Sequence, residues 1–158
     1  MEKRNELFDM SDGHKIAVTM YIPSSDATKH IHLLHGMAEH QKRYERFASY
    51  LCEMGYLVSS HDHRGHGDTA EANGGLYGYF AEKDGFERVV EDVQEVIEGV
   101  RQRVAEFPLV LFGHSMGSFI ARRYTQLHSE ELAAAVYCGT GATTPLHIAG
   151  HQLASALA

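Results

Sequence analysis

Ser115 has the surroundings of a chemically active residue. It is flanked by Gly113 and Gly117, an apolar run precedes it at residues 109–112, and an amphipathic run begins at residue 118. A serine between a strand and a helix, with a glycine two residues away on either side, is typical of a nucleophile on a sharp, strained turn. The glycines are needed because a side chain would collide where strand and helix cross. The pattern predicts acyl transfer to the Ser115 hydroxyl group; a surface turn that happens to contain a serine is the alternative.

Two further glycine-containing segments each follow a predicted strand. Residues 35–40, with the sequence HGMAEH, follow a strand predicted at residues 30–34. Residues 62–67, with the sequence DHRGHG, follow a strand predicted at residues 56–60. The first segment alone is consistent with a glycine turn that ends a strand. The second is interpreted as a loop held by an Arg–Asp pair and two glycines, which shapes the floor of the site and does no chemistry.

The sequence contains twelve histidines, which raises the question of a metal site. His61, His63 and His66 fall around the glycine-rich loop and not at the i, i+4 spacing of a helical zinc pair. Three others lie along the strand predicted at residues 30–34 and just after it. These spacings do not favour metal binding, and no metal site is predicted.

The rest of the pattern predicts an α/β fold. A turn at Asp12-Gly13 between two alternating runs predicts an antiparallel hairpin. Short apolar strands then alternate with amphipathic helices, which implies a largely parallel sheet covered on both faces. Residues 62–78 form a long polar, glycine-rich segment. In order, the predicted elements are strands at 4–9, 15–22 and 30–34, a helix at 44–52 followed by Gly55, a strand at 56–60, a helix at 86–100, a strand at 109–112, a helix at 118–127 and a strand at 132–138.

Length and composition fit one globular domain. Hydrophobic residues make up 44% of the 158 positions and charged residues 22%, both ordinary values. A formal net charge of −7 argues against binding phosphate backbones, so no nucleic-acid partner is predicted. No apolar run approaches a membrane span and no secretory signal is recognised, so cytoplasmic residence is the default expectation. Cys52 and Cys138 stand in apolar contexts and are predicted to be buried free thiols.

Three motifs taken together resemble one enzyme family. Residues 35–40, 62–67 and 113–117 match the HGxxEH, DxRGHG and GHSMG segments of the monoacylglycerol lipase and lysophospholipase branch of the α/β-hydrolases, also called the serine aminopeptidase-like group. The resemblance extends from the first hairpin to Cys138. It implies an α/β-hydrolase-type, mostly parallel sheet with helices on both faces, here incomplete because C-terminal strands and most of the lid are absent.

Carried over residue by residue, the resemblance implies that Ser115 is the nucleophile and that the backbone amides of Met37 and Met116 form the oxyanion hole. Glu39 and His40 are expected to support the oxyanion segment; a helix-terminal acid and a surface imidazole are the alternative. No cofactor and no metal are implied. The structural and supporting residues are His35, Gly36, Gly113 and Gly117 in the turns, Glu39 and His40 beside them, and Asp62 and Arg64 in the later loop.

The remaining two members of the family's triad, an acid and a histidine, follow the serine in sequence, and we expect neither in this chain. A helix after Ser115 carries the chain about 18 Å away at 1.5 Å per residue, which places His128, Glu130 and Glu131 beyond reach of the serine. His147 and His151 return towards the serine's side. They are interpreted as lid-surface residues, because a general base must be oriented by a third group.

We therefore expect the front part of a longer hydrolase, with residues 1–141 in the core and residues 142–158 beginning the lid. An uncovered sheet edge would let the chain self-associate or leave it marginally stable. The predicted reaction is hydrolysis of a monoacyl lipid or similar small acyl ester, with the chain alone inactive or very weak. A thioesterase or peptidase on the same fold is the alternative enzyme. A catalytically silent fragment or acyl-binding module is the alternative of another class.

Overall fold

The computed structural model describes residues 1–141, which contain a six-stranded sheet in the order β1-β2-β4-β3-β5-β6. β1 and β2 form an antiparallel hairpin, and β2 also pairs antiparallel with β4. The four strands β4, β3, β5 and β6 are parallel. The strands are β1 (Glu2–Asp9), β2 (Lys15–Ile22), β3 (His30–Leu34), β4 (Leu57–His61), β5 (Leu109–His114) and β6 (Leu132–Cys138).

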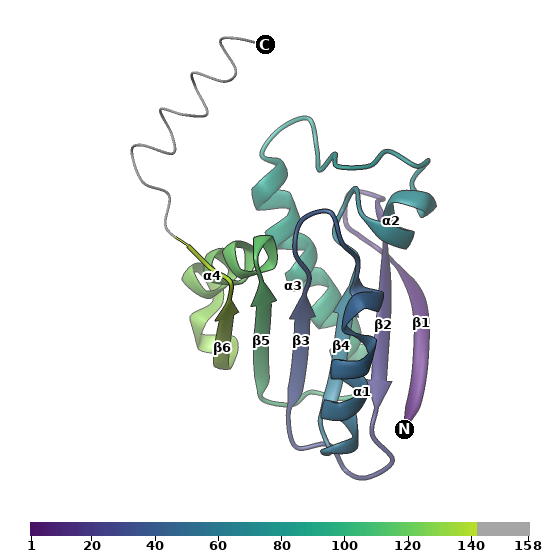
Figure 1. Ribbon diagram of the computed structural model, residues 1–158, viewed down its shortest axis with the longest axis vertical. Coiled ribbons are helices and arrows are strands. Elements are labelled where there is room, and N and C mark those ends of the chain that lie inside the picture. The colour runs from purple at the N-terminus through teal and green to yellow at the C-terminus, as the bar shows by residue number, and fades with distance from the viewer. Residues whose placement is uncertain (142–158) are drawn as a thin grey trace.

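Helices cover both faces of the sheet. α1 (Glu45–Glu53) lies in front of the sheet in Figure 1, and α3 (Gly85–Arg103) lies behind it. α4 (Met116–His128) packs against α3 and so belongs to the same layer. The short helix α2 (Gly67–Ala72) and the 3-10 helices η1 (Gln41–Tyr44) and η2 (Ser129–Glu131) lie in the connections.

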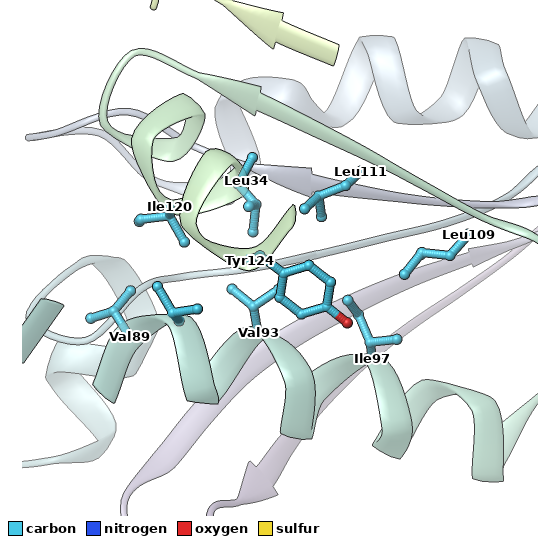
Figure 2. Packing of buried hydrophobic residues seen from close by; sticks show 10 residues of the cluster. Leu34, Val89, Val93, Ile97, Leu109, Leu111, Ile120 and Tyr124 are labelled. Carbon is cyan, nitrogen blue, oxygen red and sulfur yellow. The ribbon is translucent and has the colours of Figure 1, made fainter. Parts of the chain in front are cut away.

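The largest apolar cluster fills the space between the sheet and the layer of α3 and α4. α3 contributes a stripe of buried residues at helical spacing, which explains why an amphipathic helix forms there. A second cluster packs α1 against the opposite face of the sheet. Figure 2 labels Leu34, Val89, Val93, Ile97, Leu109, Leu111, Ile120 and Tyr124 of the first cluster.

The strand order brings three loops together at the carboxyl ends of the parallel strands. β3 lies between β4 and β5, and the three strands run parallel, so their carboxyl ends point the same way (Figure 1). The loops that begin at His35, Asp62 and Ser115 therefore leave neighbouring strands at the same edge. Ligands of open α/β sheets bind outside the carboxyl ends of their strands, so this edge is where the site is expected.

Most predicted elements are confirmed, including the hairpin, the α/β class and the helices on both faces. The polar segment at residues 62–78 is a correction, because α2 forms within it. Two residues of this helix, Thr69 and Ala70, are buried, and a six-residue helix is too short to show an apolar period. Cys52 is buried as predicted, whereas the prediction is wrong for Cys138, which is exposed at the end of strand β6.

β6 is the last strand of the sheet within the described residues, and most of its side chains are exposed. The expectation of self-association through this edge stays a prediction. Residues 142–158, where the lid was predicted to begin, lie outside the described residues, as do His147 and His151. No helix within residues 1–141 is long and apolar enough to cross a membrane.

Candidate active site

Ser115 occupies a strained turn between β5 and α4. Its backbone angles are φ 50° and ψ −118°, a region that residues with a side chain rarely adopt and that costs about 1–3 kcal/mol. The turn is held by its backbone. The N–H of Ser115 donates to the carbonyl of Cys138 at 2.9 Å, and its carbonyl accepts from the N–H of Ser118 at 2.9 Å and from the Ser118 hydroxyl at 2.6 Å.

Gly113 and Gly117 permit the close approach that this turn needs. A Cβ atom on Gly113 would lie 2.6 Å from the carbonyl carbon of Gly117, and one on Gly117 would lie 2.6 Å from the carbonyl oxygen of His35. Real Cβ atoms essentially never make such contacts with backbone. The crossing of strand and helix expected from the sequence is therefore present, and it also presses the first turn of α4 against the end of β3.

The segment after β3 lies directly against Ser115. A Cβ atom placed on Gly36 would be 3.3 Å from the Cβ atom of Ser115. Ala38 has a φ of 56°, so the chain turns sharply there, and the side chain of Met37 is 72% exposed. Within residues 1–141, the backbone N–H groups of Met37 and Met116 donate to no backbone acceptor outside regular elements. Of the two predicted oxyanion donors, Met37 thus lies in the segment against the serine, and Met116 follows the serine as the first residue of α4.

Glu39 connects the segment to its surroundings. Its Oε1 atom accepts from the N–H of Gly36 at 2.5 Å and from the hydroxyl of Tyr44 at 2.7 Å, and it lies 3.3 Å from Nδ1 of His114. Burial alone would raise the pKa of Glu39, but the hydrogen bonds from Tyr44 and Gly36 outweigh it and the pKa is lowered. A charged Glu39 therefore holds the N–H of Gly36 and fixes the turn there.

The two histidines of the segment lie in different surroundings. His35 is buried; its Nδ1 atom lies 2.7 Å from the carbonyl oxygen of Gly36, and its Nε2 atom accepts from the N–H of His63 at 3.0 Å. Burial lowers the pKa of His35 to about 4. His40 is exposed. The structure places only His35 inside the fold beneath the segment, so His40 is a wall residue at most.

Asp62 organises the loop after β4. Its Oδ1 atom accepts from the N–H of Gln41 at 2.7 Å and its Oδ2 atom from the N–H of Asp68 at 2.8 Å. Burial raises the pKa of Asp62. The carboxylate therefore ties the start of η1 to the start of α2, and no partner of Asp62 is a reacting group.

Arg64 anchors the same loop to distant parts of the chain. Its Nε atom lies 2.5 Å from Oδ2 of Asp92 in α3, and its Nη1 atom lies 2.7 Å from Oδ2 of Asp12 at the hairpin turn. The hydrogen bond from Arg64 lowers the pKa of Asp12. The prediction of an Arg–Asp pair within the loop is therefore wrong, because Arg64 pairs with carboxylates from elsewhere in the sequence and not with Asp62.

A cavity of about 470 Å³ opens beside the segment that follows β3. It is lined by residues 37–40, by residues 65–67 and by Tyr77 and Gly78. Met37 and Tyr77 give its walls large apolar surfaces, which suit an acyl chain or a similar group.

The acidic residues after α4 lie at the other end of the sheet. Glu131 pairs with Arg101 at 2.9 Å and lies 3.4 Å from Nδ1 of His128. Leu132, which follows them, pairs with Leu109 at the start of β5, whereas Ser115 follows the end of that strand. The prediction that these residues are out of reach is confirmed. Within residues 1–141 no three His, Cys, Asp or Glu side chains are arranged to hold a metal ion.

Sequence reasoning missed two partners of the site, Tyr44 and His114. The sequence pattern identifies Tyr44 only as an apolar position of a predicted helix. It identifies His114 only as a variable position between Gly113 and Ser115. The first signal was available, because Tyr44 stands only five residues after Glu39. The second depends on the approach of β3 and β5 and has no local signal.

Comparisons with known proteins agree with this architecture. The profile of the family described as "Serine aminopeptidase, S33" matches residues 25–158. The monoacylglycerol lipase of Mycolicibacterium smegmatis is 32% identical over 127 residues, which cover 80% of this chain and 43% of that protein. The human monoglyceride lipase is 32% identical over 111 residues, which cover 70% of this chain and 34% of that protein.

A carboxyl esterase from Bacillus coagulans, solved in complex with glycerol, superposes with a TM-score of 0.86 at 29% identity. The superposition covers 99% of this chain and 50% of the esterase. The chain thus spans about a third to a half of the length of the relatives it matches. With a family profile that matches most of its residues, the chain belongs to the serine aminopeptidase, S33, family of the α/β-hydrolases.

Proposed function

We propose that this chain carries the nucleophile and the oxyanion hole of a serine hydrolase that acts on a monoacyl lipid or a similar small carboxylic ester. Ser115 attacks the ester carbonyl, the alcohol leaves, and water then hydrolyses the acyl-enzyme. The backbone N–H groups of Met37 and Met116 stabilise the negative charge on the carbonyl oxygen in both steps.

The observation that carries the proposal is the strained backbone of Ser115 at the meeting point of two turns. Strain of this kind is retained where the surrounding structure demands it, and it is concentrated at functional sites. The Gly36 segment lies against the serine, and its own N–H is already bonded to Glu39. The next N–H along the chain, that of Met37, is therefore the one left for a substrate oxygen.

The substrate class follows from the cavity and the relatives. The cavity lies next to Met37, so an acyl or alcohol group bound there would extend from the reacting carbonyl. Two of the relatives at about 32% identity are monoacylglycerol and monoglyceride lipases. A neutral monoacyl ester fits apolar walls with few charged side chains, whereas a thioester or peptide amide remains the alternative for the same catalytic groups.

Ser115 still requires a general base. The ring of His114 points to Glu39 and is 42% exposed, and the described hydrogen bonds of Ser115 all involve its backbone. We expect the base and its acid partner from outside residues 1–141. A chain without them retains only the weak catalysis of an oxyanion hole.

A fluorophosphonate probe tests the proposal. In a polypeptide that includes the residues supplying the base, covalent labelling, located by peptide mass spectrometry, is expected at Ser115 and is expected to be competed by a monoacylglycerol. The variant Ser115→Ala should lose the label, and the matched variant Ser129→Ala, in η2 at the far end of the sheet, should keep it.

Labelling at another serine, or labelling that survives Ser115→Ala, would overturn the assignment of the nucleophile. Acyl-ligand binding without any labelling, even with the base supplied by a longer polypeptide, would favour the alternative of a silent acyl-binding module.

A further inference from the structure

A line of polar side chains crosses the layer between the sheet and α3. They share this face because residues two apart along a strand point to the same side. All of them are buried, with exposed fractions of 1% or less. The members of this histidine line are His30 and His32 in β3, Ser59 and His61 in β4, and His63 just after β4.

Hydrogen bonds connect the side chains of β3 and β4 in an unbroken series. The hydroxyl oxygen of Ser59 lies 2.6 Å from Nε2 of His30 and 2.6 Å from Nδ1 of His32. Nε2 of His32 lies 2.9 Å from Nδ1 of His61. The first half of the line therefore links the amino-terminal end of β3 to the carboxyl end of β4.

The second half of the line ends on the segment that leads to Met37. Nε2 of His61 lies 3.1 Å from Nδ1 of His63, and Nε2 of His63 lies 3.2 Å from the carbonyl oxygen of His35. The backbone N–H of His63 also donates to Nε2 of His35 at 3.0 Å. His63 thus forms two hydrogen bonds with His35, one through the ring of His63 and one through the backbone N–H of His63.

The carbonyl oxygen of His35, at the end of the line, determines which ring nitrogen of each histidine carries the hydrogen. A carbonyl oxygen only accepts, so Nε2 of His63 carries a hydrogen, and in a neutral ring Nδ1 is then an acceptor. Because Nδ1 of His63 accepts, Nε2 of His61 carries the hydrogen, and its Nδ1 accepts in turn. By the same argument, Nε2 of His32 carries the hydrogen that is donated to His61. The Ser59 hydroxyl donates to His32 and accepts from Nε2 of His30. Every hydrogen bond therefore points towards His35.

Burial keeps these rings neutral. It lowers the pKa of His30 and of His61 to about 3, and it lowers the pKa of His32 and of His63 well below the ordinary value. His35 has the other neutral form, with its hydrogen on Nδ1, because its Nε2 accepts from His63 and its Nδ1 faces the carbonyl of Gly36.

We propose that the histidine line is a positioning unit, in which His63 holds the His35–Gly36 peptide from the core side while Glu39 holds it from the other side. A fully paired polar network in a low-dielectric core fixes geometry, since each member would be costly to leave unpaired. The line thereby sets the position of the Met37 N–H. This last step rests on the proposed function; the direction of the line does not.

The ring nitrogen chemical shifts of the full chain, labelled with 15N-histidine, test the direction of the line. At neutral pH we expect the Nε2–H form for His30, His32, His61 and His63 and the Nδ1–H form for His35. A doubly protonated ring, or the Nδ1–H form, at any of the four would overturn the proposal.

Two variants test the propagation of this direction. Ser59→Ala should leave the proton positions of His61 and His63 unchanged, because they are set from the His35 end. His63→Phe should move the hydrogen of His61 to Nδ1, since an N–H facing a phenyl ring would lack an acceptor. The matched control is Ser60→Ala on the other face of β4, where the hydroxyl bonds to Gln41 at 3.0 Å; it should alter neither ring. A shifted hydrogen on His61 or His63 in Ser59→Ala, together with an unchanged His61 in His63→Phe, would contradict a line directed from His35.

Fluorophosphonate labelling of Ser115 tests the positioning role. In His63→Gln the amide can still donate to the His35 carbonyl, so most of the maximal labelling rate should remain. His63→Phe should lose about 10- to 100-fold of that rate at an unchanged half-saturating probe concentration. If His63 only filled space, Phe would retain more rate than Gln, which would overturn the role. Absence of labelling in an unaltered polypeptide that includes the residues supplying the base would contradict the proposed function instead, and the ring nitrogen shifts would still report on the line.

Discussion

Two loops leave the same edge of the sheet and reach a fixed shape by opposite means. The turn after β5, residues 113–117, is held by backbone packed so closely that two positions accept only glycine. The loop after β4, residues 62–67, is held by buried side chains: Asp62 bonds two backbone N–H groups, and Arg64 reaches Asp92. The turn after β5 depends on the absence of side chains at two positions. The loop after β4 depends on the charges and protons of its buried side chains.

This difference has a consequence for what can disturb each loop. The turn after β5 involves no buried titratable side chain of its own, so extra volume is its main threat. The loop after β4 is continuous with His61 and His63, whose rings are neutral and buried. Acid and the loss of a charged partner should therefore affect that loop and leave the turn after β5 to respond only indirectly.

Acid is expected to have the largest effect on stability. Unfolded histidines titrate near the ordinary value of 6.5, whereas burial lowers the pKa of His30 and His61 to about 3 and that of His35 to about 4. Between these values the unfolded chain binds more protons, so stability is full above pH 6.5 and falls as the pH drops towards 4. Each such histidine contributes about 1.4 kcal/mol per pH unit. Urea unfolding between pH 7.5 and pH 5, about 1.5 units below that ordinary value, should show a loss of several kcal/mol.

The variant His30→Leu should reduce the pH slope of the unfolding free energy by about one proton. Gly117→Ala is the matched control, because it alters the turn after β5 and keeps every buried histidine; it should lower the whole curve without changing the slope. An unfolding free energy that is flat between pH 6.5 and pH 5 would contradict the neutral buried rings.

Gly117→Ala itself should have the next largest effect. The new Cβ atom would meet the carbonyl oxygen of His35 at 2.6 Å, and both partners are backbone that cannot rotate away. Overpacking of this kind should cost about 3–4 kcal/mol of unfolding free energy. Gly141→Ala is the control, since a Cβ atom there meets nothing within 4 Å. Equal effects of the two substitutions in denaturant titrations would show that the strand–helix crossing is not close.

Arg64→Met should cost somewhat less. It leaves Asp92 buried with Arg88, 3.0 Å away, as its remaining cationic partner. Removal of one member of a buried ion pair typically costs about 3–5 kcal/mol, and the remaining arginine places this case at about 2–3 kcal/mol. Lys15→Met, which breaks an exposed pair with Asp9, should cost less than about 1 kcal/mol. Comparable losses from both variants in thermal unfolding would contradict the anchoring role of Arg64.

The same contrast explains what the sequence could predict. The turn after β5 has a local signal, because glycines two residues on either side of a serine are needed wherever strand and helix cross closely. The α3 stripe and the hairpin turn are local signals too, and these elements lie where their patterns predicted. The partners of Arg64 stand 28 and 52 residues away in sequence, so no local pattern could identify them.

The histidine line had a signal that was visible but incomplete. His30 and His32 are two residues apart in one predicted strand, so they were expected on one face, whereas His61 and His63 were assigned to the glycine-rich loop. Only the pairing of β3 with β4 places Ser59 opposite His32. Short motifs of histidine first raise the question of metal, whereas the observed use is a hydrogen-bonded line in the core.

Ser115→Gly gives the smallest expected effect and isolates the strain of the turn. Glycine adopts φ 50° and ψ −118° without the penalty of a side chain, so the substitution should stabilise the chain by about 1–2 kcal/mol. Ser115→Ala removes the same hydroxyl and keeps the strain, so its unfolding free energy should stay within about 0.5 kcal/mol of the unaltered chain. Both variants should lose labelling by the fluorophosphonate. If Gly and Ala prove equally stable in urea titrations, the serine is not strained, and the turn after β5 owes its shape to packing alone.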